Sequence, residues 1–302
     1  MTAAVIDLGT NTFHLIIAEV SDSAVNILYK VNVPVRLGEG RINENIIIPA
    51  AFERGLQALK SFSETIKQYD ASVVKAIATS AVRSAANGLD FVEAAKEQAG
   101  IDIEVITGEQ EAEYIFNGVK ATGIIQDLSL IMDIGGGSTE FIICNSEQLL
   151  WKKSYDIGAA RLMQAYFHSD PISETDQQAI VNRLDHELQD LNQMCRQHQP
   201  KMLIGSAGAF ESFATMINID TDLKSIKATS LDLKAYQTLA EKLISATHRE
   251  RDATPGLIKL RVDMIVIASI LTNYVIANCG ISQISLSTYD LKMGVLHTLA
   301  RS

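Results

Sequence analysis

The sequence predicts an α/β protein built from two similar βββαβα halves, and three observations support this prediction. Residues 5–17 (VIDLGTNTFHLII) align without gaps with residues 131–143 (IMDIGGGSTEFII). In both copies an apolar strand ends in Asp, a turn rich in Gly, Thr, Ser or Asn follows, and a β-branched strand comes next, which is the pattern of a β-hairpin. Strand and helix patterns alternate through the rest of each half, as is typical of α/β proteins.

The elements that follow each hairpin come in the same order. A third strand is predicted at 24–36 and 148–155, and a further strand at 73–79 and 201–206. Apolar residues at three and four spacing predict helices at 50–69, 89–98, 109–121, 174–197, 233–247 and 262–277. We therefore expect one domain at 1–124 and a second at 125–302, joined near the stretch 123–127. A C-terminal helix from about residue 290 is expected to pack back on the first domain.

Charge and cysteine content exclude several classes of protein. The chain of 302 residues carries 26 Lys and Arg against 36 Asp and Glu, a net charge of -10. This balance disfavours general binding to nucleic acid or to an anionic membrane. The three cysteines are widely spaced and fit neither a disulfide framework nor a metal cluster. No targeting signal is visible, so we expect a cytoplasmic protein without nucleic-acid or membrane partners.

The turns of the two repeated hairpins are candidate phosphate-binding loops. In Asp133–Glu140 three glycines and two hydroxyls allow backbone N–H groups to converge on an anion, and a tight turn alone rarely needs three glycines. The first copy, Asp7–Thr12, also fits an ordinary turn, but the repeat favours a second anion-binding loop. The predicted phosphate-binding residues of the loops are Gly9, Thr10, Asn11, Thr12, Gly135, Gly136, Gly137, Ser138 and Thr139.

The aspartates that end the two strands, Asp7 and Asp133, are candidate metal ligands. A carboxylate beside phosphate oxygens repels them unless a hard cation such as Mg²⁺ lies between them. Each could instead cap a turn, and their equivalence in the repeat favours the metal-binding interpretation. Neither a Walker sequence nor a dinucleotide-binding GxGxxG that opens a helix is present.

Several motifs in order resemble those of a known family. They are DLGTNTFHL (7–15), ATSAVRSAAN (78–87), ITGEQEAEYIFNGV (106–119), DIGGGSTEF (133–141), DIGAARL (156–162) and LSTYDLKMGVL (286–296). The chain resembles the exopolyphosphatase/guanosine pentaphosphate phosphohydrolase family of the actin-like ATPase superfamily. This resemblance implies two actin-like, ribonuclease H-like domains with an active site in the cleft between them. It also implies a homodimer and a Mg²⁺-dependent hydrolase that removes terminal phosphate from inorganic polyphosphate or pppGpp.

The family pattern Gly, any residue, Glu, Glu, Ala points to Glu111 as the carboxylate that activates water. The chain reads GEQEA at 108–112, so that only Glu111 matches a glutamate of the pattern. Alternatively, the acids at 109–113 simply favour the positive N-terminus of a helix. The resemblance also implies that Glu140 holds metal or orients water and that Arg83 binds phosphate. Without the resemblance, an exposed strand carboxylate and a surface ion pair would be the safer interpretations.

Two other functions stay open. An actin-like kinase that transfers phosphate from ATP to a small acceptor would share both loops, and residues 203–209 would then face the nucleotide. A non-catalytic binder of alarmone or polyphosphate is suggested by Asp290, Lys292 and Met293, where the family usually has Gly, Arg and Glu. The chain also lacks the extra C-terminal helical domains of longer members, so we expect less processive cleavage and a preference for shorter chains.

Overall fold

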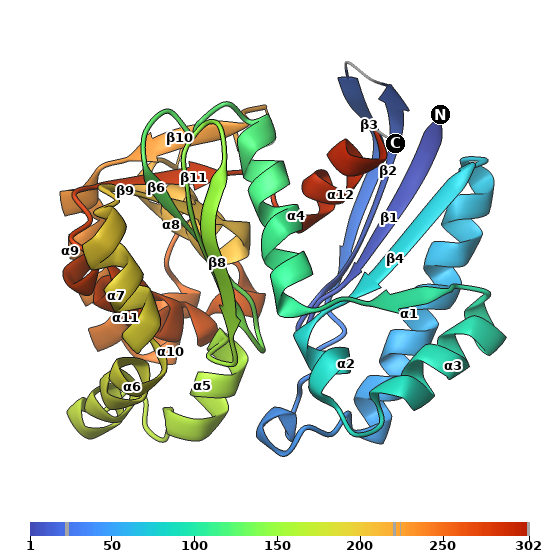
Figure 1. The fold of residues 1–302 in the computed structure, drawn as a ribbon. Helices are drawn as coiled ribbons and strands as arrows, with labels where there is room; N and C mark the ends of the chain where they lie inside the picture. The colour runs from blue at the N-terminus through green and yellow to red at the C-terminus, as the bar shows by residue number, and fades with distance from the viewer. Residues whose placement is uncertain (22–23, 220–221, 224, 301–302) are drawn as a thin grey trace.

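The computed structural model describes residues 1–21, 24–219, 222–223 and 225–300. It contains two sheets, and one lies in each half of the molecule (Figure 1). The strands of the first sheet are β1 (Thr2–Leu8), β2 (Phe13–Ser21), β3 (Ala24–Val33), β4 (Val73–Ala78) and β5 (Ile103–Val105). Those of the second are β6 (Ser129–Ile134), β7 (Thr139–Cys144), β8 (Leu149–Tyr155), β9 (Met202–Ser206), β10 (Ala228–Leu231) and β11 (Gln283–Ser287).

The two sheets share a strand order, as the sequence repeat predicts. The first has the order β3-β2-β1-β4-β5, and the second contains the equivalent run β8-β7-β6-β9-β11 with β10 added at the edge. Antiparallel pairing of β1 with β2 and of β6 with β7 confirms both predicted hairpins. Because β1 runs parallel to β4 and β6 parallel to β9, Asp7 and Asp133 lie at the carboxyl edge of their sheets.

Helices cover both faces of each sheet. The first half contains the 3-10 turn η1 (Ile42–Glu44) and the helices α1 (Pro49–Gln68), α2 (Ser80–Ser84), α3 (Gly88–Ala99) and α4 (Gly108–Ala121). The second half contains α5 (Ala159–Tyr166), α6 (Glu174–Glu187), α7 (Gln189–His198), α8 (Ala207–Ile217), α9 (Leu233–Ser245), α10 (His248–Asp252), η2 (Lys259–Arg261), α11 (Met264–Asn278) and α12 (Leu291–Leu299).

The helix predicted at 174–197 is wrong in one respect, because the structure divides it into α6 and α7. Leu188 separates them with φ -98 and ψ 21, which ends α6 and begins α7. The side chain of Leu188 is completely buried in the core of the second half. No Gly or Pro marks this break in the sequence, so the spacing of apolar residues predicts one helix across it.

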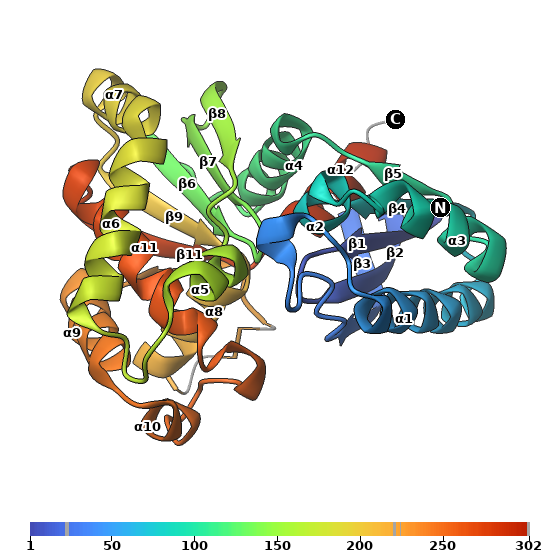
Figure 2. The same ribbon diagram turned by 90° about the horizontal axis from the view of Figure 1, so that it is seen from below.

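Helices α4 and α12 lie between the two sheets (Figure 2). Their apolar side chains share one core with β1, β2, β6 and β7. The two helices approach closely, since a Cβ at Gly294 would overlap the carbonyl oxygen of Tyr114, and one at Gly118 would overlap that of Asp290. Close backbone packing of this kind requires glycine. The C-terminal helix therefore lies against α4 and β1 of the first half.

Within the described residues, no helix combines the length and the apolar character needed to cross a bilayer.

Candidate active site

The two repeated loops, residues 9–12 between β1 and β2 and residues 135–138 between β6 and β7, meet across the two halves. A Cβ added at Gly136 would lie 2.5 Å from Asn11 Nδ2 and 2.9 Å from Thr10 Cβ. Only a residue without a side chain can approach the facing loop this closely. The glycine-rich sequence of the second loop thus brings its backbone N–H groups beside the hydroxyls and amide of the first loop.

A cavity of about 200 Å³ lies where these loops meet. It is lined by twelve of the predicted site residues, namely Asp7, Gly9, Thr10, Asn11, Thr12, Glu111, Asp133, Gly135, Gly136, Gly137, Ser138 and Glu140. Two predicted phosphate-binding residues do not line it. Arg83 pairs with Glu111 instead, and Thr139 is completely buried and donates to the carbonyl oxygen of Ile157 at 3.2 Å.

The cavity has an acidic wall formed by Asp7, Asp133, Glu140 and Glu111. Each side chain is nearly inaccessible to solvent, with residue exposures between 2% and 8%. Burial raises the pKa of Asp7 to about 6, although the nearby Lys292 opposes the shift. Burial is also the main cause that raises the pKa of Asp133 to about 7 and that of Glu140 to about 7. A cation that binds among these carboxyl groups would therefore stabilise their charged forms.

Serine hydroxyls hold two of these acids in place. Ser206, at the end of β9, donates to Asp133 Oδ2 at 3.0 Å. Ser154, on β8, donates to Glu140 Oε1 at 2.7 Å. Asp133 and Glu140 are directly opposite each other in the β6–β7 pairing, so they face the cavity as neighbours.

Glu111 reaches the cavity from the first turn of α4. A capping box begins this helix: Thr107 Oγ1 accepts from Gln110 N at 3.2 Å, and Gln110 Oε1 accepts from Thr107 N at 2.9 Å. Gln110, which departs from the family pattern, thus caps the helix while Glu111 turns inward. Burial and then Glu140 raise the pKa of Glu111 well above its usual range, and Arg83 opposes them.

Ser80 and His14 are among the polar residues of the cavity wall that the sequence did not reveal as site residues. Ser80, at the start of α2, is 1% exposed, and its hydroxyl has no hydrogen-bond partner among the described residues. His14, interpreted from the sequence as an ordinary strand residue, also lines the cavity, and its Nδ1 lies 2.7 Å from Asn32 Oδ1. Burial and then Lys292 lower the pKa of His14 to about 3, so the ring is neutral near pH 7. The unpartnered hydroxyl of Ser80 is the kind of group that a bound phosphate satisfies.

Arg161 on α5 joins the two halves at the mouth of the cavity. Its Nη1 donates to the carbonyl oxygen of Ile42 in η1 at 3.0 Å, and its Nε donates to that of Gly137 at 3.2 Å. In return, Asn43 Nδ2 donates to the carbonyl oxygen of Arg161 at 3.1 Å. These contacts join α5 of the second half to η1 of the first half.

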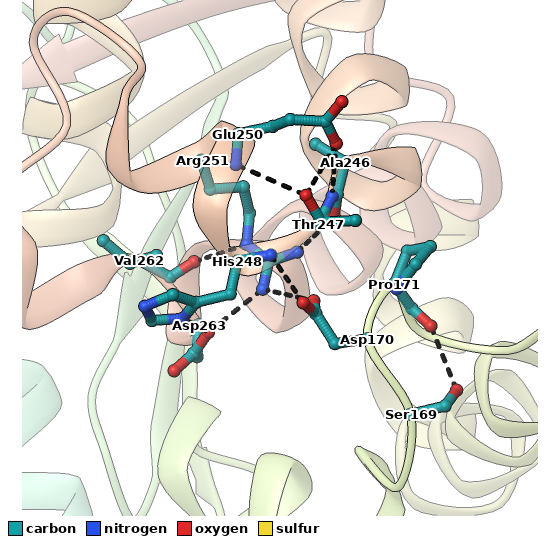
Figure 3. A network of polar contacts seen from close by, with 10 residues as sticks. All are labelled: Ser169, Asp170, Pro171, Ala246, Thr247, His248, Glu250, Arg251, Val262 and Asp263. Atoms are coloured by element: carbon teal, nitrogen blue, oxygen red, sulfur yellow. Dashed lines mark hydrogen bonds and ion pairs between the residues drawn. The ribbon is translucent and has the colours of Figure 1, made fainter.

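A buried arginine, Arg251, is the centre of a polar network in the second half (Figure 3). Arg251 is completely buried, and its Nε donates to the carbonyl oxygen of Val262 at 2.8 Å. Its Nη2 pairs with Asp170 and Asp263, each at 3.0 Å. Asp263 precedes α11, whose first residue, Met264, accepts a 3.0 Å contact from Asn11 Nδ2 of the first loop. Arg251 therefore fixes the segment from which α11 meets the phosphate loops.

The carboxylate oxygens in the cavity are suitable ligands for a magnesium ion. Mg²⁺ is usually held by one or two carboxylates together with waters and substrate phosphates. Asp133 and Glu140 offer such a pair, and Asp7 lies across the cavity from them. In the part of the chain that the structure describes, no group of three or more His, Cys, Asp or Glu forms a complete metal cage. Substrate oxygens would have to complete the coordination.

Two sheets of one strand order, with the two repeated loops facing each other between them, define a two-domain protein of the actin-like fold. Comparison with known protein families shows which family of this class the chain belongs to. The chain belongs to the Ppx/GppA phosphatase family, whose model matches residues 16–302.

Known structures and curated sequences show the same relationship. The crystal structure of an exopolyphosphatase from Cytophaga hutchinsonii is 38% identical, with a TM-score of 0.96 over 100% of this chain and 98% of that chain. The Aquifex aeolicus PPX-GPPA enzyme is 24% identical, with a TM-score of 0.82 over 99% of both chains, and shares the fold. A curated relative from Haemophilus influenzae is 27% identical over 299 residues, which cover 99% of this chain and 91% of the relative.

Proposed function

We propose that this chain is an exopolyphosphatase, a hydrolase that removes the terminal phosphate of inorganic polyphosphate with Mg²⁺ as its cofactor. Glu111 carries the proposal, because its buried carboxylate lines the cavity in which the two anion-binding loops meet. Membership of the Ppx/GppA phosphatase family and similarity to an exopolyphosphatase from Cytophaga hutchinsonii support it.

Cleavage of a phosphoanhydride requires a water aligned with the scissile bond and a base that receives its proton. The backbone N–H groups of residues 135–138 and the donors of residues 10–12 would bind the terminal phosphoryl group. The water oxygen attacks phosphorus, its proton passes to Glu111, and the shortened chain leaves with the bridging oxygen. A carboxyl group whose pKa lies well above its usual range is a better base near neutral pH.

Magnesium would be held by Asp133 and Glu140, with Asp7 nearby. When bound, the ion would neutralise phosphate oxygens that otherwise face four buried carboxyl groups. The raised pKa values of Asp133 and Glu140, each about 7, imply that cation binding competes with protons.

The size of the cavity favours the end of a phosphate chain over a whole nucleotide. Its volume of about 200 Å³ is below the roughly 300–1,000 Å³ of pockets that hold drug-sized molecules. Gly208, in the segment that would face ATP in a kinase, is covered by the guanidinium of Arg261, which also donates to Ser212 Oγ at 3.0 Å. This contact disfavours the kinase alternative.

Three finer expectations, two from the family resemblance and one from the sequence itself, are part of the proposal. They are hydrolysis of pppGpp as a second activity, a homodimer and a cytoplasmic location. Light scattering on the purified chain measures its mass in solution, and a monomeric mass would contradict the homodimer.

The test of the function is phosphate release from polyphosphate, pppGpp and ATP, each with Mg²⁺ and with EDTA. We expect phosphate release from polyphosphate to depend on Mg²⁺. With ATP, we expect no turnover that depends on an added acceptor molecule. Glu111→Gln keeps the size of the side chain and its partner Arg83, and should lower kcat by about 10²- to 10⁴-fold, as expected for a general base. Unchanged turnover in a folded Glu111→Gln variant would remove Glu111 from the mechanism, and tight polyphosphate binding without turnover in the wild type would favour the non-catalytic binder.

A further inference from the structure

Lys292 is a buried cation in the wall of the cavity that the proposed mechanism does not use. It lies in the first turn of α12, and its side chain is 7% exposed. Its Nζ lies 3.8 Å from Asp7 Oδ2, at the end of β1 beside the first anion-binding loop. Burial of an ammonium group is costly unless its charge and its donors are satisfied.

The hydrogen bonds of Lys292 are incomplete. An ammonium group has three donors, and among the described residues the acceptor within normal distance of Nζ is Asp290 Oδ2, at 2.5 Å. Asp7 Oδ2, at 3.8 Å, attracts the charge but lies beyond hydrogen-bond distance. The ammonium therefore retains donor capacity for an oxygen atom that enters the cavity beside Asp7.

The position of Lys292 is fixed by its own helix. Asp290 caps α12 by accepting from Lys292 N at 3.1 Å, and it accepts from Lys292 Nζ through its other oxygen. Gly118 and Gly294 lock α12 against α4, the helix that carries Glu111. The lysine and the proposed base are thus presented by one rigid pair of helices, so little conformational entropy is lost when a ligand binds between them.

Among the described residues that line the cavity, Lys292 is the buried cation. The acids in its lining are Asp7, Glu111, Asp133, Glu140, Glu211 and Asp290, and its basic side chains with permanent charge are Lys30, Arg261 and Lys292. Lys30 is exposed, and Arg261 is paired with Glu211 at 3.4 Å. A phosphoryl group beside Asp7 would meet a carboxylate on one side and the ammonium of Lys292 on the other.

We propose that Lys292 is a substrate-binding residue whose ammonium donates to a phosphoryl oxygen of the polyphosphate end held between the two loops. This inference rests on the proposed function and adds to it a residue that contacts the substrate. In this interpretation, Asp290 and Lys292 act together: the aspartate orients the lysine, and the lysine offsets the repulsion between Asp7 and the phosphate.

The test measures binding of inorganic tripolyphosphate by calorimetry in excess EDTA, so that the divalent cation does not contribute. The double variant Asp290→Asn/Lys292→Met removes both members of the closer ion pair, and Asp7 is the carboxylate that loses the nearby charge of Lys292. We expect its affinity to fall about tenfold or more, as for loss of a charge-assisted hydrogen bond. Lys292→Arg should retain the affinity within about threefold. Lys96→Met/Asp102→Asn removes an exposed ion pair and, like the double variant, leaves the net charge unchanged, so it is the matched control and should bind like the wild type.

Equal affinity of the wild type and the double variant would overturn the inference, as would a wild type that does not bind tripolyphosphate in EDTA. If the double variant does not fold, Lys292→Gln serves the same comparison, because its amide can still donate to Asp290 without a charge. The steady-state prediction is a raised KM in the double variant with a smaller change in kcat. A wild type that binds tripolyphosphate through Lys292 but releases no phosphate would contradict the proposed function and leave this assignment intact.

Discussion

Arg83 Nη1 donates to Glu111 Oε2 at 2.9 Å and to the carbonyl oxygen of Ile106 at 3.0 Å. The backbone contact fixes the guanidinium, and the guanidinium in turn holds the carboxylate that faces the cavity. Arg83 therefore contacts the proposed base, Glu111, and positions its carboxylate. The sequence analysis instead predicted a direct contact between Arg83 and phosphate.

Removal of this charge should shift the pH dependence of the reaction. In Arg83→Met the cation that opposes the rise in the pKa of Glu111 is lost, so that pKa increases further. Because the base must be deprotonated, the acidic limb of the profile of kcat against pH should move upward by about one unit or more. A profile whose acidic limb stays in place, in a variant with lower activity, would instead support direct phosphate binding by Arg83.

The buried carboxyl groups should make the metal-free protein less stable as the pH rises. Asp133 has a pKa of about 7 when folded and an ordinary value of 3.8, so the folded state holds the proton more strongly. The penalty to folding grows between these two pH values and is complete above about 7. Asp133→Asn in EDTA should therefore raise Tm at pH 8 by about 2–4 °C or more.

The difference in Tm between Asp133→Asn and the wild type should shrink as the pH is lowered toward 4. Scanning calorimetry across this pH range measures that difference. Asp127→Asn, at an exposed position in the same half, should show no such trend. A lower Tm for Asp133→Asn at pH 8 would contradict the electrostatic argument.

The contact between Arg161 and η1 should control closure of the cleft. Arg161→Ala removes the bonds to Ile42 and Gly137, so we expect a larger radius of gyration by X-ray scattering and a KM raised about tenfold through loss of orientation. Arg183→Ala is the matched control, because Arg183 is 44% exposed and pairs only with Glu187 among the described residues. If both variants behave alike, Arg161 does not hold the two halves together.

The network around Arg251 should be important for stability. Arg251→Met leaves Asp170 and Asp263 without their buried partner and the carbonyl oxygen of Val262 without its donor. Because the side chains of Asp170 and Asp263 are 41% and 44% exposed, water offsets most of the loss of their partner. The unsatisfied carbonyl oxygen of buried Val262 sets the scale, so we expect a loss of about 1–3 kcal/mol, which chemical denaturation measures. Arg249→Met changes an exposed arginine of the same helix and should alter the free energy of unfolding by less than about 0.5 kcal/mol.

The sequence repeat was sufficient to predict both hairpins and the common order of elements in the two halves, whereas the cleft between the halves was implied by the family resemblance. The hairpins and this order follow from local patterns that the chain carries twice, and β1–β2 and β6–β7 form as predicted. The acids that line the cavity were also visible, since Asp7 and Asp133 end their strands and Glu140 follows the second loop.

Residues whose roles depend on packing between distant elements could not be identified in this way. Arg83 meets Glu111 only because α2 and α4 follow neighbouring strands. Arg251 and Arg161 join segments far apart in the chain, and no local pattern distinguishes them from surface arginines. For Lys292 a signal existed in the departure from the family pattern at 290–293, but its direction toward Asp7 depends on how α12 packs against α4.

Because α12 lies beside α4 between the sheets, the first half of the molecule is completed by the last segment of the chain (Figure 1). A fragment ending near residue 124 would leave Ala3 and Val5 of β1 without Leu291, Val295 and other apolar side chains of α12 that cover them. Such a fragment should be poorly soluble alone and should recover its structure when a peptide spanning α12 is supplied. We therefore expect the two halves to depend on each other for folding, although the repeated order of their elements makes them look like independent units.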